Sequence, residues 1–182
     1  MRERPERTGR PRFTGVTTYT DRLGRYEFRH PSSWFRAELD GERDGVIVGP
    51  DRDDEATHFA VAVTDLGVAV TADDLAVLRE GFDHGIAELA DVSIENSRDD
   101  LYNDIVKLER TLTFSGEGET HKRRVWSMYA DHWQFTVVYQ GASVEEFAYW
   151  LPMGNYCFTS FNLPLSLWFA TDPAMRLSER TS

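Results

Sequence analysis

Residues 23–35 read Leu23-Gly24-Arg25-Tyr26-Glu27-Phe28-Arg29-His30-Pro31-Ser32-Ser33-Trp34-Phe35. Gly24 suits a turn, and Tyr26 and Phe28 share one face of a short strand because side chains alternate along a strand. Pro31 has no backbone N–H to donate, so pairing between strands should end near it. The stretch therefore predicts a turn, a strand with one aromatic face, and a stop just before Trp34.

Short strands are predicted on both sides of this stretch. Residues 17–20 and 26–30 form a hairpin, and residues 34–40 and 46–48 form two more strands. Residues 58–64 read His-Phe-Ala-Val-Ala-Val-Thr, and apolar residues stand at both the odd and the even positions, which face opposite sides of a strand. Such a run is typical of an interior strand, so we expect helices to cover both of its faces.

A first amphipathic helix is predicted to begin at Thr71. Asp74 follows Thr71 at the spacing of an N-terminal capping signature, and apolar residues then recur at helical spacing. This apolar stripe consists of Leu75, Leu78, Phe82, Ile86 and Leu89.

A second helix is predicted to begin after Ser143, which is a favourable N-cap residue. Its apolar stripe consists of Val144, Phe147, Ala148 and Leu151. Pro152 would deprive a continuous helix of a hydrogen bond. We therefore expect a break or kink at Pro152 and a turn-rich segment from there through Phe161.

The residues between the two helices predict a meander of antiparallel strands. An edge-like strand over residues 92–98 precedes a long strand over residues 105–114, which is expected to have one apolar and one solvated face. The apolar face carries Val106, Leu108, Leu112 and Phe114, and the solvated face carries Lys107, Glu109, Thr111 and Thr113. Strands over 122–130 and 133–140 follow, joined by a two-residue hairpin loop. That loop places Ala130 opposite Trp133, Met128 opposite Phe135 and Trp126 opposite Val137, with all six side chains in one core.

This order of elements predicts an α+β domain: a largely antiparallel sheet with helices packed on it as an α/β/α sandwich. From about residue 17 to residue 161 the pattern resembles the Mog1/PsbP/DcrB-like superfamily. The residues that carry the resemblance are Asp21, Gly24, Tyr26, Phe28, Pro31, Trp34 and the final Thr159-Ser160-Phe161. The resemblance implies the fold and a protein-binding role, because members are generally adaptor or stabilising proteins and some bacterial members chaperone secreted effectors. It transfers no site residues to this chain.

The chain is expected to divide into a disordered basic arm over residues 1–14, the α+β domain over residues 15–163, and a C-terminal extension over residues 164–182. The net charge of -11 makes nucleic acid and anionic lipid unfavourable partners. No apolar signal segment or membrane-spanning run is present, and Cys157 is the only cysteine. We therefore expect a cytoplasmic protein without membrane contact, and the scarcity of lysine is typical of a GC-rich bacterial genome.

No motif predicts catalytic residues, metal ligands or a cofactor. The acidic stretch 38–55 fails as a calcium loop because Ala56 and Ala62 stand where such a loop needs glycine and glutamate. It is interpreted as a solvated turn, with a cation or a basic partner as the alternative. The five histidines lack the spacing of a metal site, and Cys157 is interpreted as a small buried residue. Nucleophile elbows, P-loops and dinucleotide fingerprints are absent from the sequence.

Arg110 is an exception to the apolar face of the long strand, because its parity places it with Leu108 and Leu112. One interpretation stacks its guanidinium on the indole of Trp126. The other is an edge arginine whose charged end extends into solvent.

Three functional hypotheses remain. The first is a non-catalytic partner-binding or chaperone-like adaptor with a protein partner. The second is a small-molecule-binding protein or enzyme with an apolar pocket beside the broken C-terminal helix, lined by Trp150, Tyr156 and Trp168. The third is a homodimer that uses Trp168, Phe169 and the apolar tail as its interface.

Overall fold

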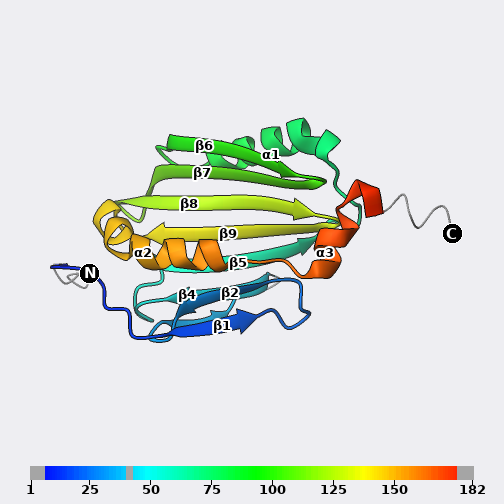
Figure 1. Ribbon diagram of the computed structural model, residues 1–182. Coiled ribbons are helices and arrows are strands. Elements are labelled where there is room, and N and C mark those ends of the chain that lie inside the picture. Colours follow the sequence, from blue (N-terminus) through cyan, green and yellow to red (C-terminus); the bar gives the residue numbers. More distant parts are fainter. Residues whose placement is uncertain (1–6, 40–42, 176–182) are drawn as a thin grey trace.

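The computed structural model describes residues 7–39 and 43–175 (Figure 1). Parts of four sequence-based predictions lie outside the described residues: positions 1–6 of the arm, 40 of the third strand, 40–42 of the acidic stretch, and 176–182 of the extension. Within the described residues, no helix is long and apolar enough to cross a membrane.

A seven-stranded antiparallel sheet forms the centre of the molecule, in the order β3-β4-β5-β9-β8-β7-β6. Strands β6 to β9 are the predicted meander, and β6 lies at one edge of the sheet, as expected. In chain order the strands are β3 (Phe35–Glu38), β4 (Asp44–Gly49), β5 (His58–Asp65), β6 (Ser93–Tyr102), β7 (Ile105–Gly116), β8 (Glu119–Ala130) and β9 (Trp133–Gly141).

The loop between β8 and β9 has the predicted length and register. Asp131 adopts a φ of 54°, as the tight two-residue turns that join twisted strands require. Ala130 pairs with Trp133, and the two predicted pairs beyond it are also present. All six side chains of these pairs belong to the main core, with Trp126 and Trp133 only partly buried.

The aromatic strand of residues 23–35 belongs to a separate two-stranded sheet made of β1 (Val16–Thr20) and β2 (Glu27–Pro31). Phe28 pairs with Tyr19 in the register of this hairpin and is fully buried. The backbone of Glu27 exchanges two hydrogen bonds with Asn162, which ties β2 to the chain after the last long helix.

The turn between β1 and β2 depends on Asp21 and Gly24. Gly24 has a φ of 68°, a conformation that glycine adopts without strain. The Asp21 carboxylate accepts hydrogen bonds from Nε and Nη2 of Arg25 at 2.7 and 2.8 Å, and from the backbone N–H groups of Leu23 and Arg25. Arg25 also forms an ion pair with Asp44 of β4 at 2.8 Å, so this turn attaches the hairpin to the large sheet.

We expect Asp21→Asn to lower the free energy of unfolding at neutral pH by about 1–3 kcal/mol, because charge-assisted hydrogen bonds to a buried guanidinium weaken. Burial alone would raise the pKa of Asp21, but the hydrogen bonds from Arg25 outweigh it and hold that pKa below its usual value. The contribution is therefore complete above the unfolded-state pKa of about 3.9 and is lost as the pH falls through the folded-state pKa.

Urea unfolding of the wild-type and Asp21→Asn proteins at about pH 7 and about pH 3 tests this linkage. The stability difference between the two proteins should shrink at the lower pH. A difference of the same size at both pH values contradicts the proposed role of the ionised carboxylate.

Helix α2 (Val144–Ser160) covers one face of the sheet together with the hairpin (Figure 1). Ser143 caps it as predicted, since its hydroxyl accepts the backbone N–H of Glu146 at 3.1 Å. The prediction of a turn-rich segment after Pro152 is wrong, because the helix continues unbroken to Ser160. Residues on both sides of Pro152 are buried against the sheet, and this packing outweighs the one hydrogen bond that proline removes.

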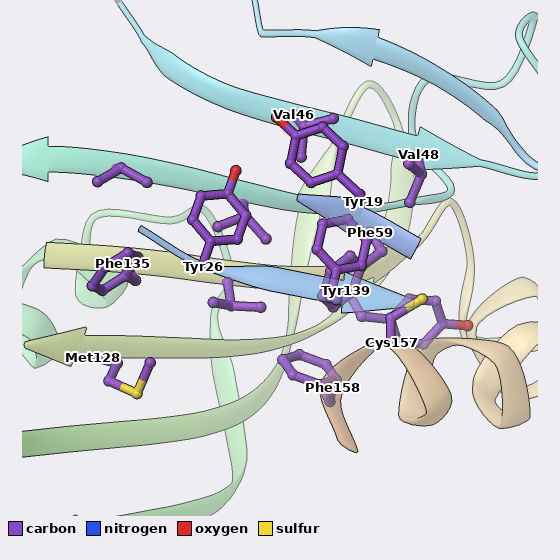
Figure 2. Packing of buried hydrophobic residues seen from close by; sticks show 14 of the residues in the cluster. Tyr19, Tyr26, Val46, Val48, Phe59, Met128, Phe135, Tyr139, Cys157 and Phe158 are labelled. Carbon is purple, nitrogen blue, oxygen red and sulfur yellow. The ribbon is translucent and has the colours of Figure 1, made fainter. Parts of the chain in front are cut away.

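The main core lies between α2, the hairpin and this face of the sheet (Figure 2). Phe59 of β5 is fully buried, and its ring centroid lies 5.0 Å from that of Phe28 and 5.2 Å from that of Phe158. Gly154 brings α2 close to β9, since a Cβ at this position would lie 2.7 Å from the ring of Tyr139. Cys157 is fully buried, as the sequence predicted.

Helix α1 (Leu75–Ala87) lies on the opposite face of the sheet, near β6 and β7 (Figure 1). A short 3-10 turn, η1 (Ala72–Asp74), precedes it, and the Asp74 carboxylate accepts the Thr71 backbone N–H at 2.8 Å, as the capping signature predicted. The predicted apolar stripe is confirmed: all five of its residues pack against buried side chains of β7 and β8.

The expectation that helices cover both faces of the strand at residues 58–64 is wrong. In β5, the residues Phe59, Val61 and Val63 face the main core, whereas Ala60 and Ala62 line a hollow on the other face. The residues of β5 that face away from the main core are apolar because they include alanines. The small alanine side chains are compatible with a partly exposed face. Helix α1 packs over β7 and β8 instead, so β5 has one covered face.

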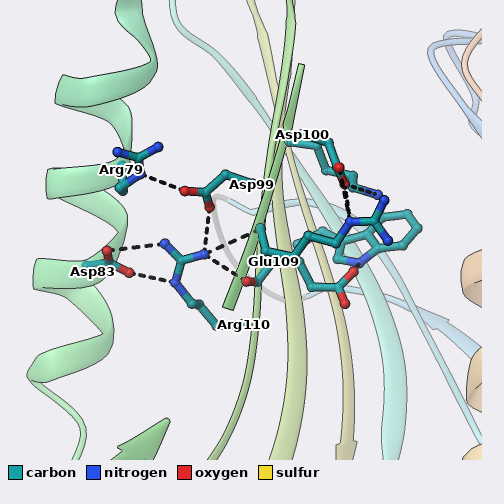
Figure 3. A network of polar contacts seen from close by, with 9 residues as sticks. Arg79, Asp83, Asp99, Asp100, Glu109 and Arg110 are labelled. Carbon is teal, nitrogen blue, oxygen red and sulfur yellow. Dashed lines mark hydrogen bonds and ion pairs between the residues drawn. The ribbon is translucent and has the colours of Figure 1, made fainter. Parts of the chain in front are cut away.

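Both interpretations of Arg110, stacking on Trp126 and extension into solvent, are wrong. The residue is 3% exposed, and it lies on the face opposite Trp126, under α1. Its guanidinium pairs with Asp83 of α1 at 2.8 Å and with Asp99 of β6 at 2.7 Å (Figure 3). Arg110 is thus neither stacked on the indole nor extended into solvent, but joins α1 to the sheet.

The prediction of a solvated face on β7 is also wrong at Glu109, which is 7% exposed. Its carboxylate accepts hydrogen bonds from the guanidinium of Arg124 and from the indole N–H of Trp126. The ammonium group of Lys107 lies 4.4 Å from the centre of the same indole. Helix α2 reaches this face, since Asn155 accepts a hydrogen bond from Arg124 at 2.9 Å.

Both ends of the described chain contact the domain. Residues 7–14 contain no helix or strand, yet Arg7 forms an ion pair with the buried Glu146 of α2 at 2.8 Å. In the C-terminal extension, helix α3 (Leu165–Ala170) contributes Leu167 to the main core. The carbonyl oxygen of Thr171 accepts the backbone N–H of Asp104 at 3.1 Å, which attaches the extension to the turn between β6 and β7.

Candidate functional site

The part of the sheet that α1 leaves uncovered is hollowed into a groove. A hollow of about 680 Å³ lies over β3, β4, β5 and β9, and a second of about 420 Å³ lies beside α1. The two hollows adjoin, because Arg123, Thr136 and Val138 line both of them. We call this feature the open-face groove.

The floor of the open-face groove is mostly apolar and follows from the alternation of the strands. Side chains that point away from the main core form it, and several of them are small. The floor consists of Ile47, Ala60, Ala62, Val125, Thr136 and Val138. In the register of the sheet, Ala60 lies between Ile47 of β4 and Val138 of β9, so the groove is hollow where an alanine separates larger residues.

Helix α1 forms one wall of the groove, with Phe82, Ile86 and Leu89 as its apolar side chains. Gly81 and Gly85 also line this wall, and a Cβ at either position would meet nothing within 4 Å. A glycine inside a helix is less stable than alanine by about 0.5–1 kcal/mol. Packing within the described residues therefore gives no reason for these two glycines.

The opposite wall is formed by the β3 side of the sheet. Phe35 contributes an aromatic ring, and the guanidinium of Arg52 lies 5.7 Å from its centre. The charged residues of the larger hollow are three arginines, Arg43, Arg52 and Arg123, and two glutamates, Glu38 and Glu55. The groove thus has a small excess of positive charge in a chain whose net charge is -11.

Arg123 lies where the two hollows meet. Its Nε and Nη2 atoms donate to Oε1 of Gln140 at 2.9 and 2.6 Å, and its guanidinium lies 4.6 Å from the ring centre of Phe114. Within residues 7–39 and 43–175, Arg123 forms no ion pair with a carboxylate. Burial lowers the pKa of this guanidinium.

His58 lies in the same row of the sheet as Arg123, with Gln140 between them in the strand register. Its Nδ1 lies 2.7 Å from the carbonyl oxygen of Glu55, and this contact assigns the proton to Nδ1. Burial and the neighbouring charge of Arg123 lower the pKa of His58, although the bond to Glu55 opposes this effect. The imidazole is therefore neutral at pH 7.

The described residues of the groove offer apolar side chains and a few charged groups. In the described part of the chain, no serine, threonine or cysteine side chain is hydrogen-bonded to His58 or Arg123. The same residues include no group of three His, Cys, Asp or Glu side chains that could hold a metal ion. An apolar floor with the partly buried guanidinium of Arg123 at its centre suits an apolar ligand that carries a negative group.

The aromatic residues that the sequence nominated do not share a pocket with one another. Tyr156 lines a hollow of about 350 Å³ between α2 and β2, and Trp168 lines another of about 340 Å³ beside the β1–β2 turn. Trp150 packs on the main core, and its indole N–H donates to Glu146 at 3.1 Å. Trp168 and Phe169 are 39% and 53% exposed on α3.

Sequence reasoning missed the open-face groove, although two signals were present. Gly81 and Gly85 stand one turn apart inside a helix whose stripe is otherwise regular. Arg123 has the parity of Val125, which faces away from the core of Trp126 and Met128. Strand alternation alone assigns this second face to solvent, so the arginine gave no reason to expect a ligand.

Comparison with known proteins identifies the fold. No protein-family model matches the sequence, and no curated protein matches it significantly. The structure is similar to that of cyanobacterial PsbP from Synechocystis, with 13% identity and a TM-score of 0.52 over 82% of this chain and 92% of that one. This chain has a PsbP/Mog1-like fold. The fold predicted from the sequence, a largely antiparallel sheet with helices packed on it, is thereby confirmed.

Two further structures with similarity to this PsbP/Mog1-like chain come from other bacteria. LpqN of Mycobacterium tuberculosis, described as involved in cell envelope biogenesis, has 8% identity and a TM-score of 0.56, with 82% of this chain and 91% of LpqN covered. PA94 of Pseudomonas aeruginosa, a protein of unknown function described as a putative regulator, has 9% identity and a TM-score of 0.50, with coverage of 83% and 98%. At such low identity these likenesses concern the fold alone.

Proposed function

We propose that this protein is a non-catalytic, chaperone-like adaptor whose open-face groove binds an apolar segment of a partner protein. The observation that carries the proposal is the uncovered apolar floor between α1 and β3. Antiparallel sheets commonly expose one face to water, but an exposed face normally alternates to polar residues. Here the exposed face carries Ile47, Ala60, Ala62 and Val138 instead.

The dimensions of the groove suit an extended or helical segment. The uncovered part of the sheet includes β3, β4, β5 and β9, and neighbouring strands lie about 4.8 Å apart. Its width of roughly 14 Å exceeds the diameter of a helix with its side chains, about 10–12 Å. A partner segment would therefore complete the layer that α1 begins.

The two wall glycines support the same proposal. Gly81 and Gly85 lower the helix propensity of α1 without admitting any described part of this chain. Residues without side chains let another backbone approach a helix closely. The cost in stability is thus compensated when a partner segment lies against this wall.

Blocking the groove tests the proposal. We expect Ala60→Trp to abolish the capture of partners from lysate of the source organism, because the indole fills the floor between Ile47 and Val138. Ala76→Trp, an exposed position on α1 that does not line either hollow, is the matched control and should retain capture. Equal capture by the wild-type protein and both variants, measured by mass spectrometry, would show that partners bind elsewhere.

A second variant separates binding from stability. Gly81→Ala combined with Gly85→Ala should raise the free energy of unfolding by about 1–2 kcal/mol, because alanine favours the helix and each added methyl group enters open space. The same variant should capture less partner, because the wall becomes thicker. Gly154→Ala is the contrasting control and should destabilise the protein, since its methyl group would collide with Tyr139.

A further inference from the structure

We propose that Arg123 selects the bound segment by pairing with an acidic side chain that the partner inserts into the open-face groove. This inference rests on the proposed function, because it assigns a charge to the segment that occupies the same groove. It predicts which apolar segments bind and which are rejected.

The other arginines that join elements of this chain show what Arg123 lacks. Arg25 pairs with Asp21 and Asp44, and Arg110 pairs with Asp83 and Asp99. Arg124, the neighbour of Arg123 in β8, pairs with Glu109 at 3.1 Å. Among the described residues, Arg123 has only the neutral amide of Gln140 and the ring of Phe114 in place of a carboxylate.

The position of the guanidinium makes it available to a ligand. Nε and Nη2 both donate to Gln140, while Nη1 makes no hydrogen bond to any residue that the structure describes. Gln140 is itself held in place, because its side-chain amide donates to the carbonyl oxygen of Ala56 at 3.1 Å. Arg123 is therefore oriented in advance, with one donor group free, at the junction of the two hollows.

Carboxylate is the group that best fits this donor. A planar guanidinium forms short, charge-assisted hydrogen bonds with carboxylates, and these are stronger where apolar surroundings exclude water. The surrounding floor includes Val125 and Val138, and His58 in the same row is uncharged. Glu38 and Glu55 line the larger hollow, but neither forms an ion pair with Arg123, so a carboxylate from a partner meets a guanidinium that no described carboxylate occupies.

The charge of the whole chain makes the selection specific. With a net charge of -11, the surface as a whole repels acidic segments. Attraction for an acidic side chain is thus local to the cationic positions of the groove, with Arg123 at the junction of the two hollows and Arg43 and Arg52 in the larger one. A segment that binds should be apolar along its length and carry a single acidic residue at a defined position.

Selection from a library of random peptides displayed on phage tests the inference with the intact protein as target. Peptides enriched on the wild-type protein should be apolar with Asp or Glu at one common position. Arg123→Gln should bind these peptides about tenfold or more weakly, because a charged hydrogen-bonded contact is lost. Arg123→Glu should enrich peptides with Lys or Arg at the same position.

Ala60→Trp distinguishes failure of this inference from failure of the proposed function. Peptides that bind Ala60→Trp as well as the wild-type protein, or no enriched peptides at all, would overturn the groove itself as a binding site. Peptides that lose binding to Ala60→Trp, but show no acidic position or bind Arg123→Gln equally well, would overturn only the role of Arg123. Enriched peptides that free acetate competes away at millimolar concentration would indicate a general anion site instead and also overturn selection of a segment.

Thermal unfolding without a peptide tests whether the role of Arg123 is purely structural, because the loss of a structural contact would lower the unfolding midpoint. If Arg123 serves a ligand, Arg123→Gln should leave the unfolding midpoint unchanged or raise it, because a partly buried charge without a carboxylate partner disappears. A clear fall in the midpoint would show that its contacts with Gln140 and Phe114 stabilise the fold, and would contradict the inference. Arg123→Lys, which keeps the charge without the planar fork, should retain the acidic preference at reduced affinity.

Discussion

Replacing Phe28 by alanine should lower the free energy of unfolding by about 3–5 kcal/mol, the range for removing a large buried aromatic side chain. Phe28 is fully buried, and its ring centroid lies 5.5 Å from that of Tyr19 and 5.0 Å from that of Phe59. It thus connects the two-stranded sheet to the seven-stranded one. The variant should lose both the packing of the ring and part of the attachment of the hairpin.

Urea unfolding followed by tryptophan fluorescence measures this loss. Arg29→Ala, the next position on the exposed side of β2, is the matched control and should change the free energy of unfolding by less than about 0.5 kcal/mol. A similarly small effect for Phe28→Ala would mean that the hairpin does not contribute to the main core as the structure describes.

Arg110→Met should lower the free energy of unfolding by about 2–3 kcal/mol. The substitution leaves Asp83 and Asp99 close together without the guanidinium that separates them, and breaking a buried pair is costly because the remaining charges stay uncompensated. The value is below that for a fully buried pair, because the side chain of Asp83 is 41% exposed and water reduces the cost.

Two comparisons isolate the electrostatic part of this effect. Arg79→Met removes the other arginine on Asp99, but this side chain is 45% exposed, so the loss should stay below about 1 kcal/mol. Arg110→Met combined with Asp99→Asn should cost less than the sum of the two single variants, because the pair is removed together. Additive losses would contradict direct coupling between these side chains.

The Arg110 cluster also affects the proposed binding site. Arg110 holds Asp83 of α1 by an ion pair (Figure 3). Asp83 lies between Gly81 and Gly85 in the sequence, so this ion pair also fixes the position of the two glycines relative to the sheet. Arg110→Met should therefore weaken partner binding as well as stability, whereas Phe28→Ala acts on the opposite face of the sheet. This difference separates general loss of stability from local displacement of α1.

Strong local signals account for the predictions that the structure confirms. The tight turn of residues 131–132 determines the register of β8 and β9, and strand alternation then places Trp126, Met128 and Phe135 together. Ser143 begins α2, because its hydroxyl accepts a backbone N–H of the first turn, and Thr71 begins the 3-10 turn that leads into α1, because the Asp74 carboxylate accepts its backbone N–H. In each case the decisive interaction is between residues close in sequence.

The predictions that were wrong concern interactions between distant residues. Whether α2 continues through Pro152 depends on how well Phe147, Met153 and Phe158 are buried against strands far away in the chain. The partners of Arg110 come from α1 and β6, and alternation along β7 indicates only which face it occupies. The candidate site was missed for the same reason, because it exists only where α1 fails to cover the sheet.

The sequence by itself determined the α+β class, the meander and its register, the cap of α2, the capped turn that leads into α1 and the aromatic face of residues 23–35, because turns, caps and alternation act over a few residues. Only the tertiary structure decided which part of the sheet α1 covers, which arginines find carboxylates and where an apolar face stays open. The physical reason is that burial and ion pairing are properties of surfaces brought together by the whole fold. Arg110 and Arg123 are both strand arginines that face α1's side of the sheet, yet one meets two aspartates and the other meets none among the described residues.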